Sequence, residues 1–347
     1  VFFYKQLGIF LSFCMSYCLS TICFCMMLLI VSCTKNETTF THHAKSKTNI
    51  QFNNIIKPTD NINILDFHYL YNGGGVGIAD FNNDALPDIL FGGNQVSSVL
   101  YINQGNFKFE KSDAINTTDW INGISIIDIN NDGLKDIYLS VGGHNCDEGN
   151  CKNLFYINTS TKNKIEFIEQ AEAFGLATDF YSQQAVFFDA DKDGDLDCYQ
   201  LQNHVDRANK NYPKPKRYFS TKSYDKFYLN QQVETDELFF KDASEIWNVK
   251  NPGFGLGVVL TDVNNDGFLE VYVANDFISD DLIYINKEGK SFKESSKQLL
   301  AHTSYNSMGV DAADLNNDGY EEIMVVDMLP YTNGRQKTML GTMNYDK

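Results

Sequence analysis

Asp128-Ile-Asn130-Asn-Asp132-Gly-Leu-Lys-Asp136 is the stretch that decides the fold, because five versions of this nine-residue pattern, itself included, occur in the chain. Every copy has an oxygen-bearing side chain at positions 1, 3, 5 and 9. Oxygen atoms at alternate positions of one tight turn can converge on a hard cation. The five sets are Asp80, Asn82, Asp84 and Asp88; Asp128, Asn130, Asp132 and Asp136; Asp189, Asp191, Asp193 and Asp197; Asp262, Asn264, Asp266 and Glu270; and Asp314, Asn316, Asp318 and Glu322.

Calcium is the cation that this spacing favours, because it takes six to eight oxygen ligands at roughly 2.3 to 2.6 Å. Position 6, where a sharp turn requires positive φ, is glycine in four copies and Ala85 in the first. We therefore predict up to five calcium ions, with the first site the weakest or most strained. By analogy with other calcium loops, the carbonyl oxygen at position 7 adds a ligand from Leu86, Leu134, Asp195, Phe268 or Tyr320.

Two other interpretations of the loops are less favoured. An EF-hand requires Glu at position 12 and a helix on each side, whereas the flanking runs here are short and rich in β-branched and aromatic residues. Metal-free Asx-rich turns would explain any single copy, but five copies with the same oxygen positions argue against them. The residues at position 12 are Phe91, Leu139, Gln200, Val273 and Val325.

The sequence around each loop also repeats, which indicates a repeat architecture. One short apolar run precedes each loop and another follows it, so each loop is predicted to join the strands of a hairpin. In four copies a third run ends in Asn, as in Leu100-Tyr-Ile-Asn103, and a fourth follows, as in Phe107-Lys-Phe109. Units of this kind, spaced by 48, 61, 73 and 52 residues, predict an all-β fold, a β-propeller of four-stranded antiparallel blades.

Three segments are expected along the chain: a signal peptide at 1–32, a linker at 33–48 and the propeller at 49–347. The fifth unit ends before its third and fourth strands, so we expect a propeller truncated at its C-terminus. Residues 7–32 form an apolar run after Lys5, as in a signal peptide. The end of this run, Ile30-Val-Ser-Cys33, resembles a bacterial lipobox, in which Cys33 carries the lipid.

An uncleaved membrane anchor is the alternative for this apolar run, because it is long enough to span a bilayer. Both interpretations place the propeller outside the cytoplasm. The first predicts a lipoprotein of the cell envelope, attached to the outer membrane or the cell surface through its N-terminal lipid.

Charge and cysteine content limit the choice of partners. The formal net charge is −17, and much of it lies in the five loops, so empty loops would hold carboxylates in mutual repulsion. This charge argues against nucleic-acid binding. Cys146 and Cys151 are close in sequence and are predicted to form a disulfide; a zinc site that includes His144 is the alternative.

The sequence contains no recognisable catalytic motif: no Gly-x-Ser-x-Gly, no phosphate-binding glycine loop and no His-Glu-x-x-His. We nominate no catalytic residues. The leading hypothesis is a calcium-binding module that binds or adheres to a protein or a glycan. The alternative is a polysaccharide lyase or hydrolase built on a calcium-bearing propeller.

The loops, the Phe91-Gly-Gly and Val141-Gly-Gly turns and the Tyr-Ile-Asn strands resemble the FG-GAP/VCBS repeats of integrin alpha-subunit propellers. Tyr71-Asn-Gly-Gly-Gly, Asn275-Asp-Phe and Val326-Asp-Met-Leu-Pro are similar to phrases in VCBS-repeat lipoproteins of Bacteroidetes, which often carry an ASPIC/UnbV domain and are similar to the cartilage acidic protein family. The resemblance covers about residues 49–335. It implies a seven-bladed propeller with the metal loops on one rim, and it does not identify a ligand.

Overall fold

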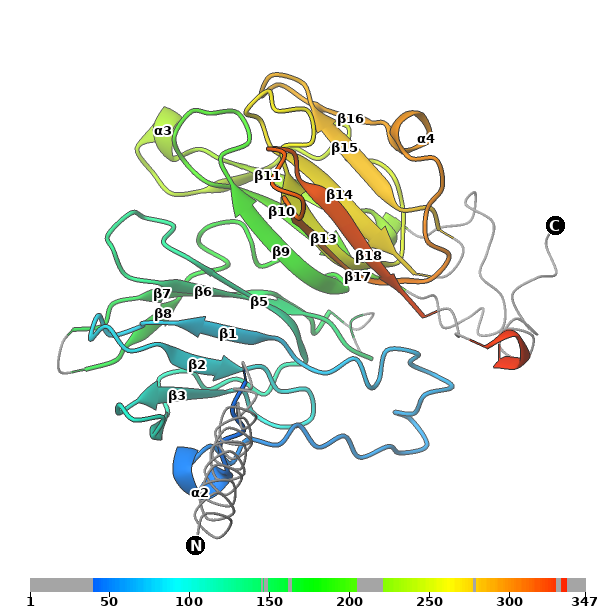
Figure 1. Cartoon of the computed structure of the whole chain (residues 1–347). Coiled ribbons are helices and arrows are strands. Elements are labelled where there is room, and N and C mark those ends of the chain that lie inside the picture. Colours follow the sequence, from blue (N-terminus) through cyan, green and yellow to red (C-terminus); the bar gives the residue numbers. More distant parts are fainter. Residues whose placement is uncertain are drawn as a thin grey trace, which may run out of the picture. The chain divides into compact units, whose positions relative to one another are not determined.

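The computed structural model describes residues 40–144, 146, 149–161, 164–204, 221–276, 279–328 and 332–335 (Figure 1). The chain divides into two units, Val1–Ala44 and Lys45–Lys347, and the fold described below belongs to the second. The predicted signal peptide and Cys33 lie outside the described residues. Within those residues, no helix is both long enough and apolar enough to cross a membrane.

The described residues of the second unit form four antiparallel four-stranded sheets and one two-stranded sheet, so the predicted all-β fold of four-stranded blades is confirmed. In each four-stranded sheet, strands that follow one another in sequence pair with each other. The helices within the described residues are short, and they include α2 (Lys45–Thr48), α3 (Gln232–Thr235), α4 (Ser296–Leu299) and the 3-10 helix η4 (Thr221–Ser223). The strands are β1 (Val76–Ala79), β2 (Asp88–Phe91), β3 (Val99–Asn103) and β4 (Phe109–Ser112) in blade 1; β5 (Ile121–Ile127), β6 (Asp136–Val141), β7 (Leu154–Asn158) and β8 (Phe167–Glu169) in blade 2; β9 (Ser182–Phe188), β10 (Asp197–Gln202), β11 (Lys226–Asn230) and β12 (Phe240–Asp242) in blade 3; β13 (Gly255–Thr261), β14 (Glu270–Asn275), β15 (Leu282–Asn286) and β16 (Phe292–Glu294) in blade 4; and β17 (Ser307–Ala313) and β18 (Glu322–Asp327) in blade 5.

The hydrophobic core lies between consecutive blades. Phe227, Trp247 and Phe292 belong to one cluster that joins blades 3 and 4, and Tyr138 and Cys198 belong to another that joins blades 2 and 3. The second strands β6, β10 and β14 are buried along their whole length. Burial on both faces removes the alternation expected of a half-exposed strand, and it holds each sheet against the next.

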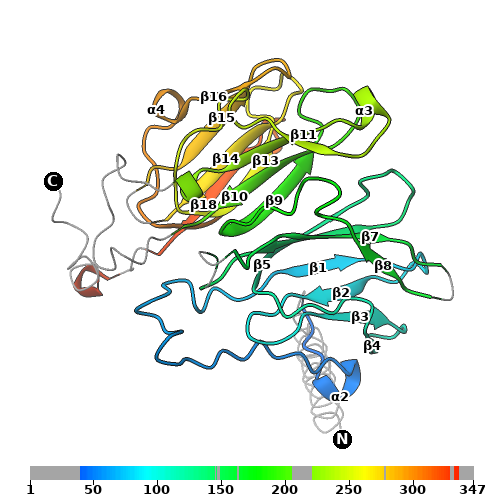
Figure 2. The same cartoon turned by 180° about the vertical axis from the view of Figure 1, so that it is seen from behind.

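Glycines allow the first strands of neighbouring blades to approach closely. Strand β5 packs against β9, and β9 lies beside β13 in both views (Figures 1 and 2). A Cβ atom added to Gly123 on β5 would lie 2.5 Å from the carbonyl oxygen of Gln183 and 3.0 Å from Cα of Gln184. Gly309 occupies the place on β17 that corresponds to Gly123 on β5. A Cβ atom added there would have more space, because the nearest atom, on the Val326 side chain, would lie 3.6 Å away.

A buried polar side chain before each third strand fixes the far end of the second strand. Its oxygen accepts the N–H of a residue at or just after the end of the second strand, so a buried donor is satisfied. In blades 1 to 4 the donor and acceptor are, in turn, Gly93 and Ser98 at 3.1 Å, Val141 and Asn153 at 2.7 Å, Gln202 and Asp225 at 2.8 Å, and Asn275 and Asp281 at 2.8 Å.

Gly123→Ala is expected to lower the free energy of unfolding by about 1–3 kcal/mol, because the new Cβ meets backbone atoms that cannot move away. Urea denaturation measures the change. Gly309→Ala is the matched control, since the added methyl group there has ordinary van der Waals space. Equal losses in the two variants would show that close approach at Gly123 is not the cause.

The buried Asp225 carboxyl is expected to make the free energy of unfolding depend on pH. Burial raises its pKa to about 7, although the Gln202 N–H and the Tyr199 hydroxyl, 2.7 Å away, act in the opposite direction. A carboxyl whose pKa is raised on folding binds its proton more tightly in the folded chain. Its contribution to stability is therefore lost as the pH rises from about 4 through about 7.

Asp225→Asn should remove this loss, so the stability of the variant relative to wild type should increase by about 2–4 kcal/mol between pH 4 and pH 8. Asn153 shows that an amide can fill this position in blade 2. Urea denaturation at several pH values provides the measurement. Asp113→Asn, at a side chain that is 93% exposed, is the control for the change in charge. Parallel pH profiles for wild type and Asp225→Asn would contradict the prediction.

Candidate metal loops

All five predicted loops join the first and second strands of a sheet, and they share one hydrogen-bond pattern. The carboxylate at position 1 accepts the N–H of position 6, and the carboxylate at position 5 accepts the N–H of position 7. In the second loop these bonds measure 3.0 Å, from Gly133 to Asp128, and 2.8 Å, from Leu134 to Asp132. The equivalent bonds in the other loops span 2.7 to 3.2 Å. The carboxylates therefore turn inward over the loop backbone.

Two residues of every loop have positive φ. Position 6 does so as predicted, and Ala85 has φ of 68°, in the region that glycine occupies in the other four loops. Position 4 also has positive φ, which was not predicted from the sequence. Four copies have Asn at this position, and Asn could have indicated it, because Asn tolerates the left-handed region better than most residues. The position-4 residues are Asn83, Asn131, Lys192, Asn265 and Asn317, with φ of 56°, 56°, 63°, 55° and 60°.

The position-9 carboxylate is buried in blades 1 to 4 and connects its loop to the third strand. In blade 2, Asp136 accepts the N–H of Ile129 at 3.0 Å and that of Asn158, at the end of β7, at 2.8 Å. Asp88 and Asp197 accept the equivalent pairs of N–H groups at 2.8 to 3.1 Å. Glu270 accepts the N–H of Val263 at 3.0 Å. A carboxylate oxygen that accepts one N–H keeps a lone pair for a cation.

Burial raises the pKa of these position-9 carboxyls: to about 6 for Asp88 and Asp136, about 8 for Asp197 and about 7 for Glu270. The backbone N–H groups act in the opposite direction, and neighbouring loop carboxylates add to the increase. A cation in the loop would stabilise the ionised form.

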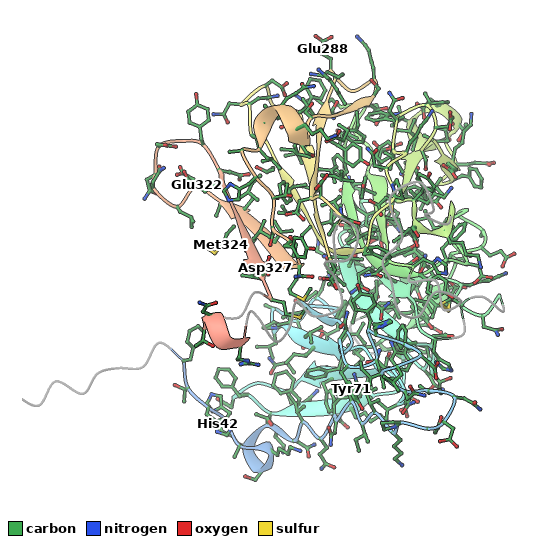
Figure 3. The ribbon with its side chains drawn as sticks, turned by 90° about the vertical axis from the view of Figure 1, so that its right-hand side faces the viewer. His42, Tyr71, Glu288, Glu322, Met324 and Asp327 are labelled. Carbon is green, nitrogen blue, oxygen red and sulfur yellow. A yellow bond between two sulfur atoms is a disulfide. The ribbon has the colours of Figure 1, made fainter. Side chains whose placement is uncertain are left out.

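The fifth loop has the same backbone pattern on an exposed hairpin. Glu322 at the start of β18 accepts the N–H of Leu315 at 2.8 Å and the amide N–H of Asn316 at 2.7 Å. Figure 3 shows Glu322, Met324 and Asp327 along this strand. In this blade the position-9 side chain therefore connects positions 2 and 3 of its own loop.

The third loop contains the densest group of carboxylates. Asp189, Asp191 and Asp193 each offer one oxygen, and these atoms all lie within 4.8 Å of one another. The Oδ1 atom of Asp189 is buried and accepts no hydrogen bond from the described part of the chain. In the other loops position 3 is Asn, and the Asn82 and Asn130 amides donate to the position-5 carboxylate at 3.0 Å. The third loop has no such amide at position 3, and a buried Asp189 oxygen is available there as a ligand for a cation.

Loops of neighbouring blades contact each other or the next blade. The amide of Asn158 donates to the carbonyl of Phe81 in the first loop at 3.0 Å, and Asn286 donates to Ala190 in the third loop at 2.8 Å. The ammonium of Lys192 lies 3.8 Å from the centre of the Phe268 ring in the fourth loop. These contacts place successive loops at the same end of their sheets.

The two cysteines of blade 2 form the predicted disulfide and not the alternative zinc site. The structure joins Cys146 and Cys151 in a disulfide, and both residues are buried in the cluster between blades 1 and 2. They are therefore not available as zinc ligands.

Comparison with known proteins assigns the family. A family model described as an FG-GAP-like repeat matches residues 63–139 and 222–325, just over half of the chain. The chain therefore belongs to the FG-GAP-like repeat family. A search of curated proteins found no match.

The similar solved structures share little sequence with this chain. An Agrocybe aegerita lectin that recognises non-reducing terminal N-acetylglucosamine is 14% identical over 72% of this chain, with a TM-score of 0.42. This chain spans 59% of that lectin's length. A thermostable family-43 glycoside hydrolase is 12% identical over 70% of this chain and 81% of its own, with a TM-score of 0.35.

Ala85→Gly is expected to raise the free energy of unfolding by about 0.5–1 kcal/mol, because glycine adopts φ of 68° without the steric cost that a side chain incurs. Ala313→Gly, just before the fifth loop, is the control; it should lower stability by about 0.5–1 kcal/mol, since Ala313 lies on a strand. Thermal and urea denaturation of both variants test this. A loss of stability in Ala85→Gly would show that Ala85 is not strained.

Proposed function

We propose that the chain is a calcium-binding propeller that acts outside the cytoplasm as a binding or adhesion module for a protein or a glycan. The arrangement of carboxylates in the third loop is the observation that best supports calcium binding. There, oxygens of three carboxylates lie within 4.8 Å of one another, and a buried Asp189 oxygen accepts no hydrogen bond from the described residues. The same backbone arrangement in the other four loops supports one calcium ion in each.

The loop charges support the same conclusion. None of the salt bridges within the described residues involves a loop carboxylate. Carboxylates held this close without a cation repel one another. Calcium would supply two positive charges in each loop, so binding would be coupled to folding. Asp80, Asp128, Asp262 and Asp314, with the other loop oxygens at positions 3, 5 and 9, are the proposed ligands in the remaining loops.

A hollow with a mixed polar and apolar lining, at the opposite end of blade 4, is the proposed contact surface for the ligand. It has a volume of about 490 Å³, and Asp280, Glu294, Lys297 and His302 are among the residues that line it. These side chains offer hydrogen-bond donors and acceptors of both charges, which suit a glycan or a polar protein segment. Segments that connect strands on a rigid scaffold are common binding surfaces.

We infer from the sequence of residues 1–33 that the mature protein is anchored to the cell envelope by a lipid on Cys33. Incorporation of labelled palmitate that is lost in Cys33→Ala would support this anchor. Unchanged incorporation would contradict it.

Binding of the partner is tested by exposing the protein to a glycan array with and without calcium. Specific binding that is reduced in Lys297→Ala and His302→Ala, and unchanged in Lys108→Ala on blade 1, would support the hollow as the contact surface. Binding that is equal in all three variants would contradict it. A glycan that is cleaved would instead favour the alternative, a polysaccharide-active enzyme.

Calcium is expected to raise the melting temperature, and a chelator is expected to lower it. An ion present at 100 times its dissociation constant stabilises the folded chain by about 2.7 kcal/mol per site. Calorimetry in calcium, in magnesium and in EGTA measures the effect. Asp128→Asn should reduce the calcium-dependent increase, whereas Asp113→Asn, outside the loops, should not. The same melting temperature in calcium and in EGTA would contradict the calcium part of the proposal.

A further inference from the structure

The third loop differs from the other four at position 7. This position is Asp195, where the other loops have the apolar residues Leu86, Leu134, Phe268 and Tyr320. Its backbone carbonyl can serve the calcium ion of the loop as the other position-7 carbonyls do. Its side chain adds a further carboxylate, for which the loop pattern has no role.

The Asp195 side chain is buried, with only 8% of the residue exposed. Its Oδ2 atom accepts the N–H of Val233 on α3 at 3.1 Å. Its Oδ1 atom is buried and has no hydrogen-bond partner among the described residues. A buried carboxylate oxygen without a donor is costly, so a positive partner is expected there.

Helix α3 brings a third carboxylate to this place. Because the Val233 N–H is bound to Asp195, the neighbouring Glu234 is held beside the loop. One oxygen from each of Asp193, Asp195 and Glu234 forms a group in which all atoms lie within 4.8 Å of one another. Asp193 also belongs to the group with Asp189 and Asp191. The two groups therefore share one carboxylate.

The described residues supply no ion-pair partner to this second group. In the described part of the chain, no salt bridge involves Asp193, Asp195 or Glu234. Lys192 is the nearest lysine in sequence, and its ammonium lies over the Phe268 ring of the next blade.

We propose that Asp193, Asp195 and Glu234 bind a second calcium ion next to that of the third loop, with Asp193 bridging the two ions. This inference rests on the proposed calcium function and adds a site that, among the described blades, only blade 3 contains. Three carboxylates provide hard oxygen ligands, and water completes the coordination shell, as is usual where calcium is bound by few protein groups. The second ion ties α3 to the loop.

Native mass spectrometry of the full chain in calcium tests this by counting bound ions. Glu234→Gln and Asp195→Asn are each expected to bind one calcium ion fewer than wild type. Glu234 is exposed, so its substitution leaves the fold intact. In Asp195→Asn the amide oxygen can still accept the Val233 N–H. Neither substitution changes the position-1, -3, -5 or -9 side chains of any loop.

Glu237→Gln is the matched control, since it removes the same charge from an exposed residue three positions further along. It should bind as many ions as wild type. If Glu234→Gln and Asp195→Asn also bind as many ions as wild type, the second site is wrong while the loop sites stand. If wild type itself binds no calcium, the proposed function fails together with this site. Loss of an ion from Glu237→Gln as well would contradict the second site by showing a nonspecific effect of charge.

Discussion

The buried position-9 carboxylate is the interaction on which the rest of each blade depends. It accepts one N–H from its own loop and another from the end of the third strand, as Asp136 does with Ile129 and Asn158. Because the loop, the second strand and the third strand all meet at this carboxylate, the hairpin cannot separate from the strand beside it without leaving buried donors unsatisfied. The polar residue before the third strand does the same at the other end of the sheet. Each complete blade is thus fixed at both ends by side chains and along its faces by the apolar clusters.

This arrangement explains why charge gathers in the loops. Burial raises the pKa of the position-9 carboxyls, and loop carboxylates close by raise it further. Positive charge nearby would therefore favour the ionised form of the group that organises the blade. None of the described salt bridges provides that charge, and a calcium ion at positions 1, 3 and 5 would. The proposed metal would in this sense be part of the fold, and the proposed ligand surface lies at the other end of the sheets.

Much of the fold could be predicted from sequence, because loop spacing and strand patterning are local properties. The oxygen positions, the hairpins and the four-stranded units follow from residues close in the chain. The exact ends of strands depend on backbone dihedral angles and were harder to predict from the sequence. The fourth strand of blade 1 was expected from Phe107 and begins at Phe109, because Asn106 and Phe107 both have positive φ and lie in the turn.

Contacts between individual side chains far apart in sequence were not predicted. Nothing near Asp195 indicates that Glu234 lies beside it, since α3 follows two strands and a long connection. Likewise Asp225 and Asp281 carry no motif, and only the register of the sheet shows that they bind the end of the preceding strand. Such pairs are set by tertiary packing, which a repeat pattern constrains but does not specify.

The position-9 carboxylate holds the loop and the third strand together, and we propose that calcium stabilises this connection. Amide hydrogen exchange at Ile129 and Asn158 tests it most directly, because both N–H groups donate to Asp136. In calcium these two amides should be among the most slowly exchanging in blade 2. Chelation should accelerate their exchange more than that of Phe155, in the middle of the blade. Exchange at Ile129 and Asn158 that is fast in calcium, or that chelation leaves unchanged, would contradict the claim.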